Sequence, residues 1–134
     1  MPENNNSHIC IIKSEIRSLI TVESFLFDFF KFNYIADEFF PKIFLCLSEV
    51  VVNSIFHGNN GDLNKSIVIR LRKKGHRLFV SVKDEGNGFN IHEIDDPTKI
   101  ENIKREFGRG IHIIKSLSDS IYYKKNQCFL RFSI

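Results

Sequence analysis

The sequence predicts an α+β fold, a two-layer sandwich in which a mixed, mainly antiparallel β-sheet carries helices on one face. Two observations favour it. Short runs with alternating apolar and polar residues are interleaved with longer runs at helical spacing, and turn residues join most neighbouring strands into hairpins. A length of 134 residues with 43% apolar residues suffices for one compact domain with a substantial core. We expect a flexible tail over 1–7 and a single domain over 8–134.

The first half of the chain predicts one strand and two helices. Residues 8–13 have the composition of a short strand. Residues 15–33 carry apolar side chains at helical spacing, and Ser14 is expected to cap that helix. A second helix is predicted over 39–56, and the glycines and asparagines of 57–61 are expected to end it.

The second half predicts two pairs of strands. Residues 66–72 and 78–83 flank a short turn, which indicates an antiparallel hairpin. Residues 120–124 and 128–134 are expected to form a closing pair. The segment between the two pairs, 84–109, is polar and punctuated by glycine, so it is a candidate lid over a ligand.

Composition and charge exclude several classes of protein. A formal charge of +3 is far below that of a protein built to coat nucleic acid. The first residues lack a basic start and an apolar stretch, so neither a secretory signal nor a membrane-spanning segment is expected. Three widely spaced cysteines indicate neither a disulfide framework nor a zinc site. We therefore expect a cytoplasmic protein.

The predicted helix over 39–56 carries one narrow polar stripe on an otherwise apolar surface. Placed at 100° per residue, Cys46, Glu49, Asn53 and His57 share that stripe. A carboxylate and an amide on a largely buried helix need partners. Those partners are either an internal hydrogen-bond network or a ligand, and the helix alone does not distinguish the two.

A second candidate motif, Asp84-Glu-Gly86-Asn-Gly88, follows the strand over 78–83. An aspartate at the end of a strand can accept a hydrogen bond from a base amino group, and glycines beside it let the backbone approach a flat ring. Most such sequences are ordinary turns, so that interpretation stays open for this motif alone.

A third candidate motif, Gly108-Arg109-Gly110, is expected to open a helix over 111–117. Unpaired amides at a helix N-terminus favour anions, and Arg109 or Arg105 would add positive charge. The sequence predicts a phosphate cradle here. A glycine-rich helix start without a ligand is the alternative.

The three motifs together, in this order, resemble those of the Bergerat-type ATPases. Ser48 to Gly58 resembles the N box, Asp84 to Gly88 the first glycine box, and Gly108 to Asp119 the second. The wording and length are most similar to the anti-sigma factor serine/threonine kinases of this superfamily, which also includes the histidine kinases. The resemblance implies a Bergerat ATP-binding fold.

The resemblance also implies roles for individual residues in binding ATP and Mg²⁺. Asn53 would ligate Mg²⁺, and Glu49 would be the catalytic general base. Asp84 would hold the adenine amino group. The remaining implied nucleotide contacts are Gly86 and Gly88 beside the adenine, and Arg105, Gly108, Arg109 and Gly110 near the phosphates.

For the whole protein, the resemblance implies a kinase that phosphorylates a small antagonist protein of the STAS type and sequesters a sigma factor or a similar regulator. It also implies a homodimer, and neither nucleic acid nor a membrane as partner. Residues 125–128 replace the glycine-rich turn that related chains carry before the last strand. This departure favours one alternative, a nucleotide-dependent binding module without catalysis. A detached histidine-kinase domain is another.

Overall fold

The computed structural model describes residues 7–87 and 102–134, with the side chains of the second range from Arg109 onward. Its main elements are β1 (His8–Lys13), α1 (Leu19–Phe32), α2 (Phe40–Asn53), β2 (Ser66–Lys74), β3 (Arg77–Lys83), α3 (Asn102–Leu117), β4 (Ser120–Lys124) and β5 (Gln127–Ser133). Every predicted strand and helix is therefore present, with bounds that differ by a few residues except at the start of α3.

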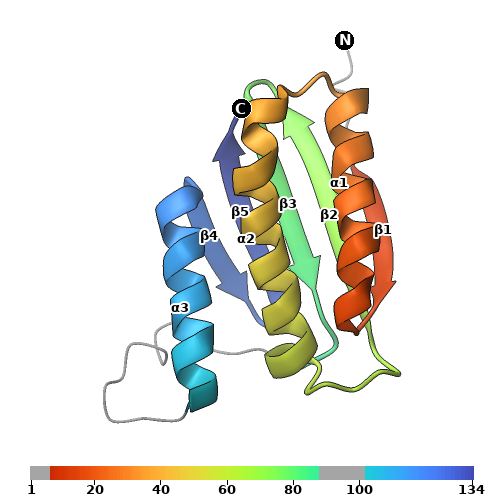
Figure 1. Ribbon diagram of the computed structural model, residues 1–134, viewed down its shortest axis with the longest axis vertical. Coiled ribbons are helices and arrows are strands. Elements are labelled where there is room, and N and C mark those ends of the chain that lie inside the picture. The colour runs from red at the N-terminus through yellow and green to blue at the C-terminus, as the bar shows by residue number, and fades with distance from the viewer. Residues whose placement is uncertain (1–6, 88–101) are drawn as a thin grey trace.

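The five strands form one sheet in the order β1-β2-β3-β5-β4. All four neighbouring pairs are antiparallel, so the described sheet is entirely antiparallel rather than mixed. Figure 1 shows α1, α2 and α3 side by side over one face of this sheet, with α2 in the middle. The α+β two-layer sandwich is confirmed.

The core lies between the sheet and the three helices. Alternate residues of the strands face the helices, as the period of two requires. The buried core residues of the strands are Ile12, Ile67, Ile69, Leu71, Leu78, Val80, Val82, Cys128, Leu130 and Phe132. Within residues 7–87 and 102–134, no helix lies over the other side of the sheet (Figure 1), and the side chains of that side are described below.

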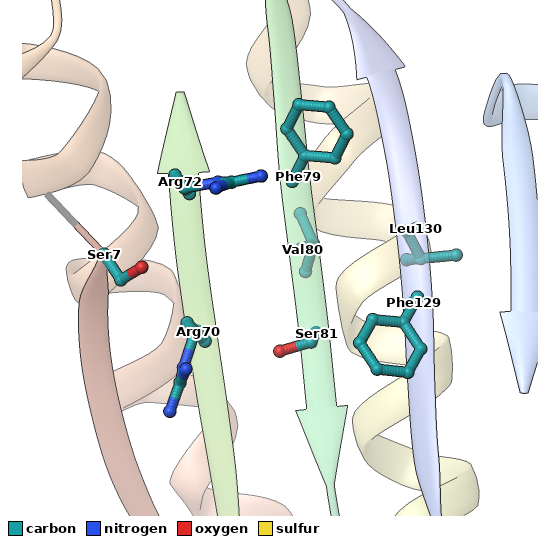
Figure 2. A pocket seen from close by; sticks show the side chains of 8 residues that line it. All are labelled: Ser7, Arg70, Arg72, Phe79, Val80, Ser81, Phe129 and Leu130. Carbon is teal, nitrogen blue, oxygen red and sulfur yellow. The ribbon is translucent and has the colours of Figure 1, made fainter. Parts of the chain in front are cut away.

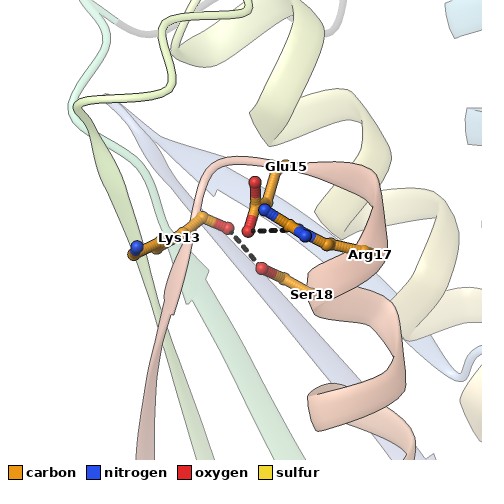
Figure 3. Close-up of polar contacts among 4 residues, drawn as sticks. All are labelled: Lys13, Glu15, Arg17 and Ser18. Atoms are coloured by element: carbon orange, nitrogen blue, oxygen red, sulfur yellow. Dashed lines mark hydrogen bonds and ion pairs between the residues drawn. The ribbon is translucent and has the colours of Figure 1, made fainter.

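The connection from β1 to α1 differs from the prediction in its cap. Ser14 is fully buried and accepts a hydrogen bond from Asn59, so it does not cap a helix. A short 3₁₀ turn, Ile16–Ser18, precedes α1. The Ser18 hydroxyl donates to the carbonyl of Lys13 at 2.8 Å (Figure 3), which fixes the chain where it turns from strand to helix.

Helix α2 is the central element of the helical layer. It is followed directly by a π-helical turn, Ser54–Gly58, in which the Asn59 amide donates to the Ser54 carbonyl at 2.7 Å. The segment Asp37–Gly58 is long and apolar enough to cross a membrane, with a mean hydropathy of 1.6. Its buried residues, Ile43, Leu47 and Val50 among them, belong to the core, which is typical of a central helix under a sheet.

Helix α3 begins at Asn102, so the prediction that it begins at the glycine pair is wrong. Gly108 and Gly110 lie inside the helix. Ile111 and Ile114 are buried against the rest of the core. Part of the predicted lid therefore belongs to a helix, and residues 88–101 lie outside the described residues.

Candidate functional site

The candidate site starts on α2, where Glu49 and Asn53 are separated by one helical turn. Asn53 is only 5% exposed, and its Nδ2 has no hydrogen-bond partner among the described atoms. Glu49 is half-buried. Cys46, which was assigned to the same stripe, is fully buried in the core, where burial raises the pKa of its thiol to about 11. Within the described part of the stripe, the groups that could bind a ligand are therefore the Glu49 carboxylate and the Asn53 side-chain amide, whose Nδ2 has no hydrogen-bond partner.

Helix α3 lies against this stripe at a glycine. A Cβ atom added to Gly110 would lie 2.8 Å from Oε2 of Glu49 and 3.8 Å from Nδ2 of Asn53. Both distances place the Gly110 backbone directly over the two polar side chains. The second glycine motif and the N box are therefore in contact, although they are more than fifty residues apart in sequence.

The predicted phosphate cradle does not have the expected geometry. Inside a helix, each amide donates to the carbonyl four residues earlier, so the amides of Gly108, Arg109 and Gly110 are used within α3. The prediction of free amides at a helix N-terminus is wrong for this conformation. Arg109 is exposed.

Asp84 immediately follows β3 and is 4% exposed. The amide of Gly86 donates to Oδ1 of Asp84 at 2.8 Å. Burial raises the pKa of this carboxyl, while the Gly86 amide, the Ser54 side chain and the charge of Lys65 oppose the rise. A carboxylate has about four lone pairs, so one that accepts from the Gly86 amide and the Ser54 side chain can still accept a further hydrogen bond.

Two glycines join Asp84 to the end of the π-helical turn. A Cβ atom on Gly58 would lie 2.0 Å from Oδ2 of Asp84, and one on Gly86 would lie 2.1 Å from the Gly58 carbonyl oxygen. No side chain fits at either position without moving its neighbour. The N box and the first glycine box therefore meet by direct backbone contact.

Asn59 is a residue that the sequence analysis missed, because it was assigned to turn chemistry. It is fully buried, and its Nδ2 donates to the Ser14 hydroxyl and to the Ser66 carbonyl, both at 3.1 Å. Its Oδ1 accepts from the amide of Glu85 at 2.7 Å. Asn59 holds together the ends of β1 and α2, the start of β2 and the first glycine box. An asparagine beside a predicted motif was the available signal.

Tyr123 on β4 is a second missed residue. Burial raises the pKa of its hydroxyl well above the ordinary value, and the hydroxyl lies near Cys128, Asp84 and Asn53. It is close to Asn53 without reaching Nδ2 in hydrogen-bond geometry. Only the fold brings it beneath the site, since nothing in the sequence of β4 points there.

The turn between β4 and β5 is tied to Asp84. The Asp84 amide donates to the Asn126 carbonyl at 3.0 Å, and the Asn126 side chain donates to the Asp84 carbonyl. Lys125 has a positive φ of 55° in this turn. The residues that replace the glycine-rich turn of related chains therefore fix the backbone of the predicted adenine-binding residue.

The structure thus groups the predicted residues in two connected places. Glu49, Asn53 and Gly110 meet between α2 and α3, and Asp84 and Gly86 meet the end of the same helix through Gly58. Gly88 lies outside the described residues. The structure describes no side chain for Arg105, and nothing beyond the helical backbone for Gly108.

The donor set fits a hard cation that also binds phosphate. Asn53 offers an amide oxygen, which magnesium accepts as a ligand when phosphates and water complete its shell. Among residues 7–87 and 109–134, no group of three or more His, Cys, Asp or Glu could hold a metal alone. A magnesium ion at this site would therefore need the nucleotide as a co-ligand.

Comparisons with known proteins identify the family of the chain. A family model described as the histidine kinase-like ATPase domain matches residues 12–134. A protein named anti-sigma F factor, from Anoxybacillus flavithermus (strain DSM 21510 / WK1), is 31% identical over 86 residues. That match covers 60% of this chain and 58% of the relative's length. The chain therefore belongs to the histidine kinase-like ATPase domain family, an ATP-binding family, and within it resembles the anti-sigma regulators.

Proposed function

We propose that this chain binds ATP with Mg²⁺ along helix α2, with the phosphates beside Glu49 and Asn53 and the adenine beside Asp84. One observation carries the proposal. The helix that bears Glu49 and Asn53 ends at Gly58, which contacts the Asp84 carboxylate. Two groups with the chemistry to hold opposite ends of a nucleotide are thereby joined by one rigid element. Membership of an ATP-binding family supports the same assignment.

Each residue has a distinct task in this proposal. The Asp84 carboxylate accepts a hydrogen bond from the adenine amino group through a lone pair that the Gly86 amide and the Ser54 side chain leave available. Gly86 lets the turn after Asp84 pack against the Gly58 carbonyl, and in this proposal that turn and Gly88 form the wall beside the ring. Asn53 provides a ligand for Mg²⁺, which neutralises phosphate charge when it is bound.

The second glycine box contributes after a local rearrangement. The amides of Gly108, Arg109 and Gly110 can donate to phosphate only if the turns of α3 before Ile111 open, because these amides are used within the helix. We include this opening in the proposal. Arg105 and Arg109 add positive charge to the same segment. Far-ultraviolet circular dichroism should then show a loss of helical signal when Mg²⁺ and ATP are added.

The finer function that we propose is an anti-sigma-type serine/threonine kinase of the cytoplasm. Glu49 is the general base: its carboxylate takes the proton of an attacking serine hydroxyl as the γ-phosphoryl group moves to the oxygen. The substrate would be a small antagonist of the STAS type, and the unoccupied kinase would sequester a sigma factor or a similar regulator, as a homodimer. The printed name of the relative, anti-sigma F factor, supports this direction.

The nucleotide site is tested by calorimetry of Mg²⁺-dependent ATP binding. We expect the wild type to bind, Asn53→Ala and Asp84→Ala to lose measurable affinity, and the exposed-loop control Asn64→Ala to bind normally. A folded wild type that does not bind ATP would refute the proposal.

Catalysis is tested separately with Glu49→Gln. The amide keeps the size of the side chain but cannot take a proton, so phosphate transfer to a cognate antagonist should fall by roughly 10²-fold or more while ATP affinity is kept. The exposed control Glu38→Gln should transfer phosphate normally. A phosphoprotein product that is stable in acid would exclude a histidine-kinase activity.

A second candidate is a nucleotide-dependent binding module without catalysis. The position of Gly110 favours it, because the α3 backbone covers the Glu49 carboxylate and limits access for a substrate hydroxyl. This candidate predicts ATP binding without transfer, and equal partner binding by the wild type and Glu49→Gln.

A further inference from the structure

The face of the sheet that carries no helix has an unusual distribution of charge. We call it the open sheet face and define it by the strand residues that alternate with the core positions. Every charged side chain at these positions is a cation: Lys13, Arg70, Arg72, Lys74, Arg77, Lys83, Lys124 and Arg131. The whole chain has 19 basic and 16 acidic residues, so the lack of acids at these strand positions does not follow from composition. Two carboxylates reach the edge of the face, where Glu85 accepts a hydrogen bond from Ser66 and Asp119 accepts one from Ser133.

The same face exposes large apolar side chains. Ile9, Ile11 and Tyr122 are 52%, 68% and 59% exposed, and Phe129 is 37% exposed. Val68 and Phe79 are half-buried on the same face. Exposed apolar groups that are gathered on one surface mark an interaction site more often than isolated ones do.

The strand register places cations directly beside these apolar groups. Arg72 and Arg131 lie opposite Phe79 on its two neighbouring strands, and the Arg72 guanidinium is 5.1 Å from the Phe79 ring centre. In the next row across the sheet, Ile9 lies opposite Arg70. A cation therefore stands next to an apolar side chain in both rows.

A pocket of about 240 Å³ lies in the middle of this face. Figure 2 shows Arg70 and Arg72 on one side of it and Phe79 and Phe129 on the other, all directed away from the helices. A second pocket, lined by Lys74, His76 and Arg77 among others, also includes Phe79. The hollow surface thus continues toward one end of the sheet and stays basic.

We propose that the open sheet face is a docking surface for an acidic protein segment in which carboxylates alternate with apolar side chains. Charge complementarity favours this partner, because its carboxylates would meet the arginines while its apolar side chains fill the pocket beside Phe79. A partner with apolar groups alone would offer no carboxylate to Arg70 and Arg131.

Three other occupants fit less well. A second copy joined face to face would bring cations against cations, which disfavours association. Nucleic acid would match the charge, and the rings of Tyr122 and Phe129 could stack on bases, but its bases and phosphates would leave Ile9 and Ile11 without apolar partners. Phe79 already carries the Arg72 guanidinium. A lipid surface would match charge and apolarity but would not require the pocket.

This inference does not rest on the proposed nucleotide site. Glu49, Asn53 and Gly110 lie in the helical layer, on the opposite side of the sheet (Figure 1). Substitutions on the open sheet face should therefore leave ATP affinity unchanged, and calorimetry of the same variants separates a failure of one proposal from a failure of the other.

The test uses a fluorescent peptide in which glutamate alternates with leucine. About eight residues suffice to cross five strands spaced about 4.8 Å apart. Binding to the full chain is followed by fluorescence anisotropy. A double variant, Arg70→Glu with Arg131→Glu, is compared with a control of equal charge change on the helical side, Lys31→Glu with Lys115→Glu. Both variants are first checked for an unchanged thermal unfolding curve. A milder pair, Arg70→Gln with Arg131→Gln, serves if the first does not fold.

We expect the peptide to bind the wild type and the control, and to bind the open-face variant at least ~10-fold more weakly. A peptide with lysine in place of glutamate, or serine in place of leucine, should not bind. The proposal is overturned if the acidic peptide does not bind the wild type. It is equally overturned if a single-stranded DNA of matched charge or phosphatidylserine vesicles bind this face more tightly than the peptide does, or if sedimentation shows a dimer that the open-face variant dissociates.

Discussion

Replacing Asp84 with asparagine should raise the stability of the fold at neutral pH while it lowers the affinity for ATP. The carboxyl is 4% exposed, and burial raises its folded-state pKa above the unfolded value. Between these two pKa values the folded chain binds more protons than the unfolded chain. The free energy of unfolding therefore falls as the pH rises through that window and is lower at neutral pH than it would be with a neutral side chain.

The asparagine keeps the contacts that the fold itself uses. Its Oδ1 can still accept from the Gly86 amide, and its size matches the space beside Gly58. What is lost is the charged acceptor for the adenine amino group. Such a hydrogen bond contributes about 1.5–3 kcal/mol, so ATP should bind roughly 10- to 150-fold more weakly.

Thermal unfolding from acid to neutral pH tests the predicted gain in stability, and calorimetry with Mg²⁺ and ATP tests the predicted loss of ATP affinity. The gain in stability of Asp84→Asn over the wild type should be largest at neutral pH and shrink toward acid pH. The control is Asp28→Asn on the exposed surface of α1, which should change neither quantity. A variant that unfolds more easily at neutral pH, or one that binds ATP as the wild type does, would refute the reasoning.

Three other substitutions have distinct expected outcomes. Gly110→Ala places a methyl group 2.8 Å from the mobile end of Glu49, so we expect unfolding to be unchanged or up to ~1 kcal/mol harder, and phosphate transfer to fall by roughly 10–100-fold. Gly58→Ala meets the buried Asp84 carboxylate at 2.0 Å instead, and denaturant titration should show a loss of about 1–3 kcal/mol together with weaker ATP binding. Asn59→Ala leaves several buried groups without partners and should cost about 2–4 kcal/mol in the same titration.

The three outcomes are distinguishable from one another. Gly110→Ala would contradict the proposed contact if it unfolded as readily as Gly58→Ala, or if it transferred phosphate at the wild-type rate. Wild-type stability of Asn59→Ala would show that water replaces its hydrogen bonds.

The elements that the sequence predicted correctly have strong periodic patterns. The strand pairs were found because their apolar residues alternate, and α2 because its surface is apolar on nearly every side. The positions of Asp84 and Asn53 relative to one another could not be predicted in that way. They depend on the contact between Gly58 and Gly86, and glycine is equally common in turns that contact nothing.

Two predictions from the sequence were wrong, the start of α3 and the capping role of Ser14, and both failed because tertiary contacts decide the structure there. Gly108 and Gly110 favour a helix start by local preference, yet α3 runs through them, and Gly110 packs against α2 where a side chain would meet Glu49. Ser14 has the chemistry of a cap, but its hydroxyl instead accepts from Asn59, a residue 45 positions away. Tertiary contacts outweighed local propensity in both places, and no local pattern encodes them.

The π-helical turn Ser54–Gly58 gives the end of α2 a rotational setting that an α-helix would not have. A π turn holds one more residue than an α turn, so deleting a residue between Asn53 and Gly58 would restore ordinary winding and turn the helix end by about 100°. Gly58 would then point away from Asp84, although every side chain named in the site would still be present. A variant that keeps the site must therefore keep the number of residues between Asn53 and Gly58, as well as the side chains of the site.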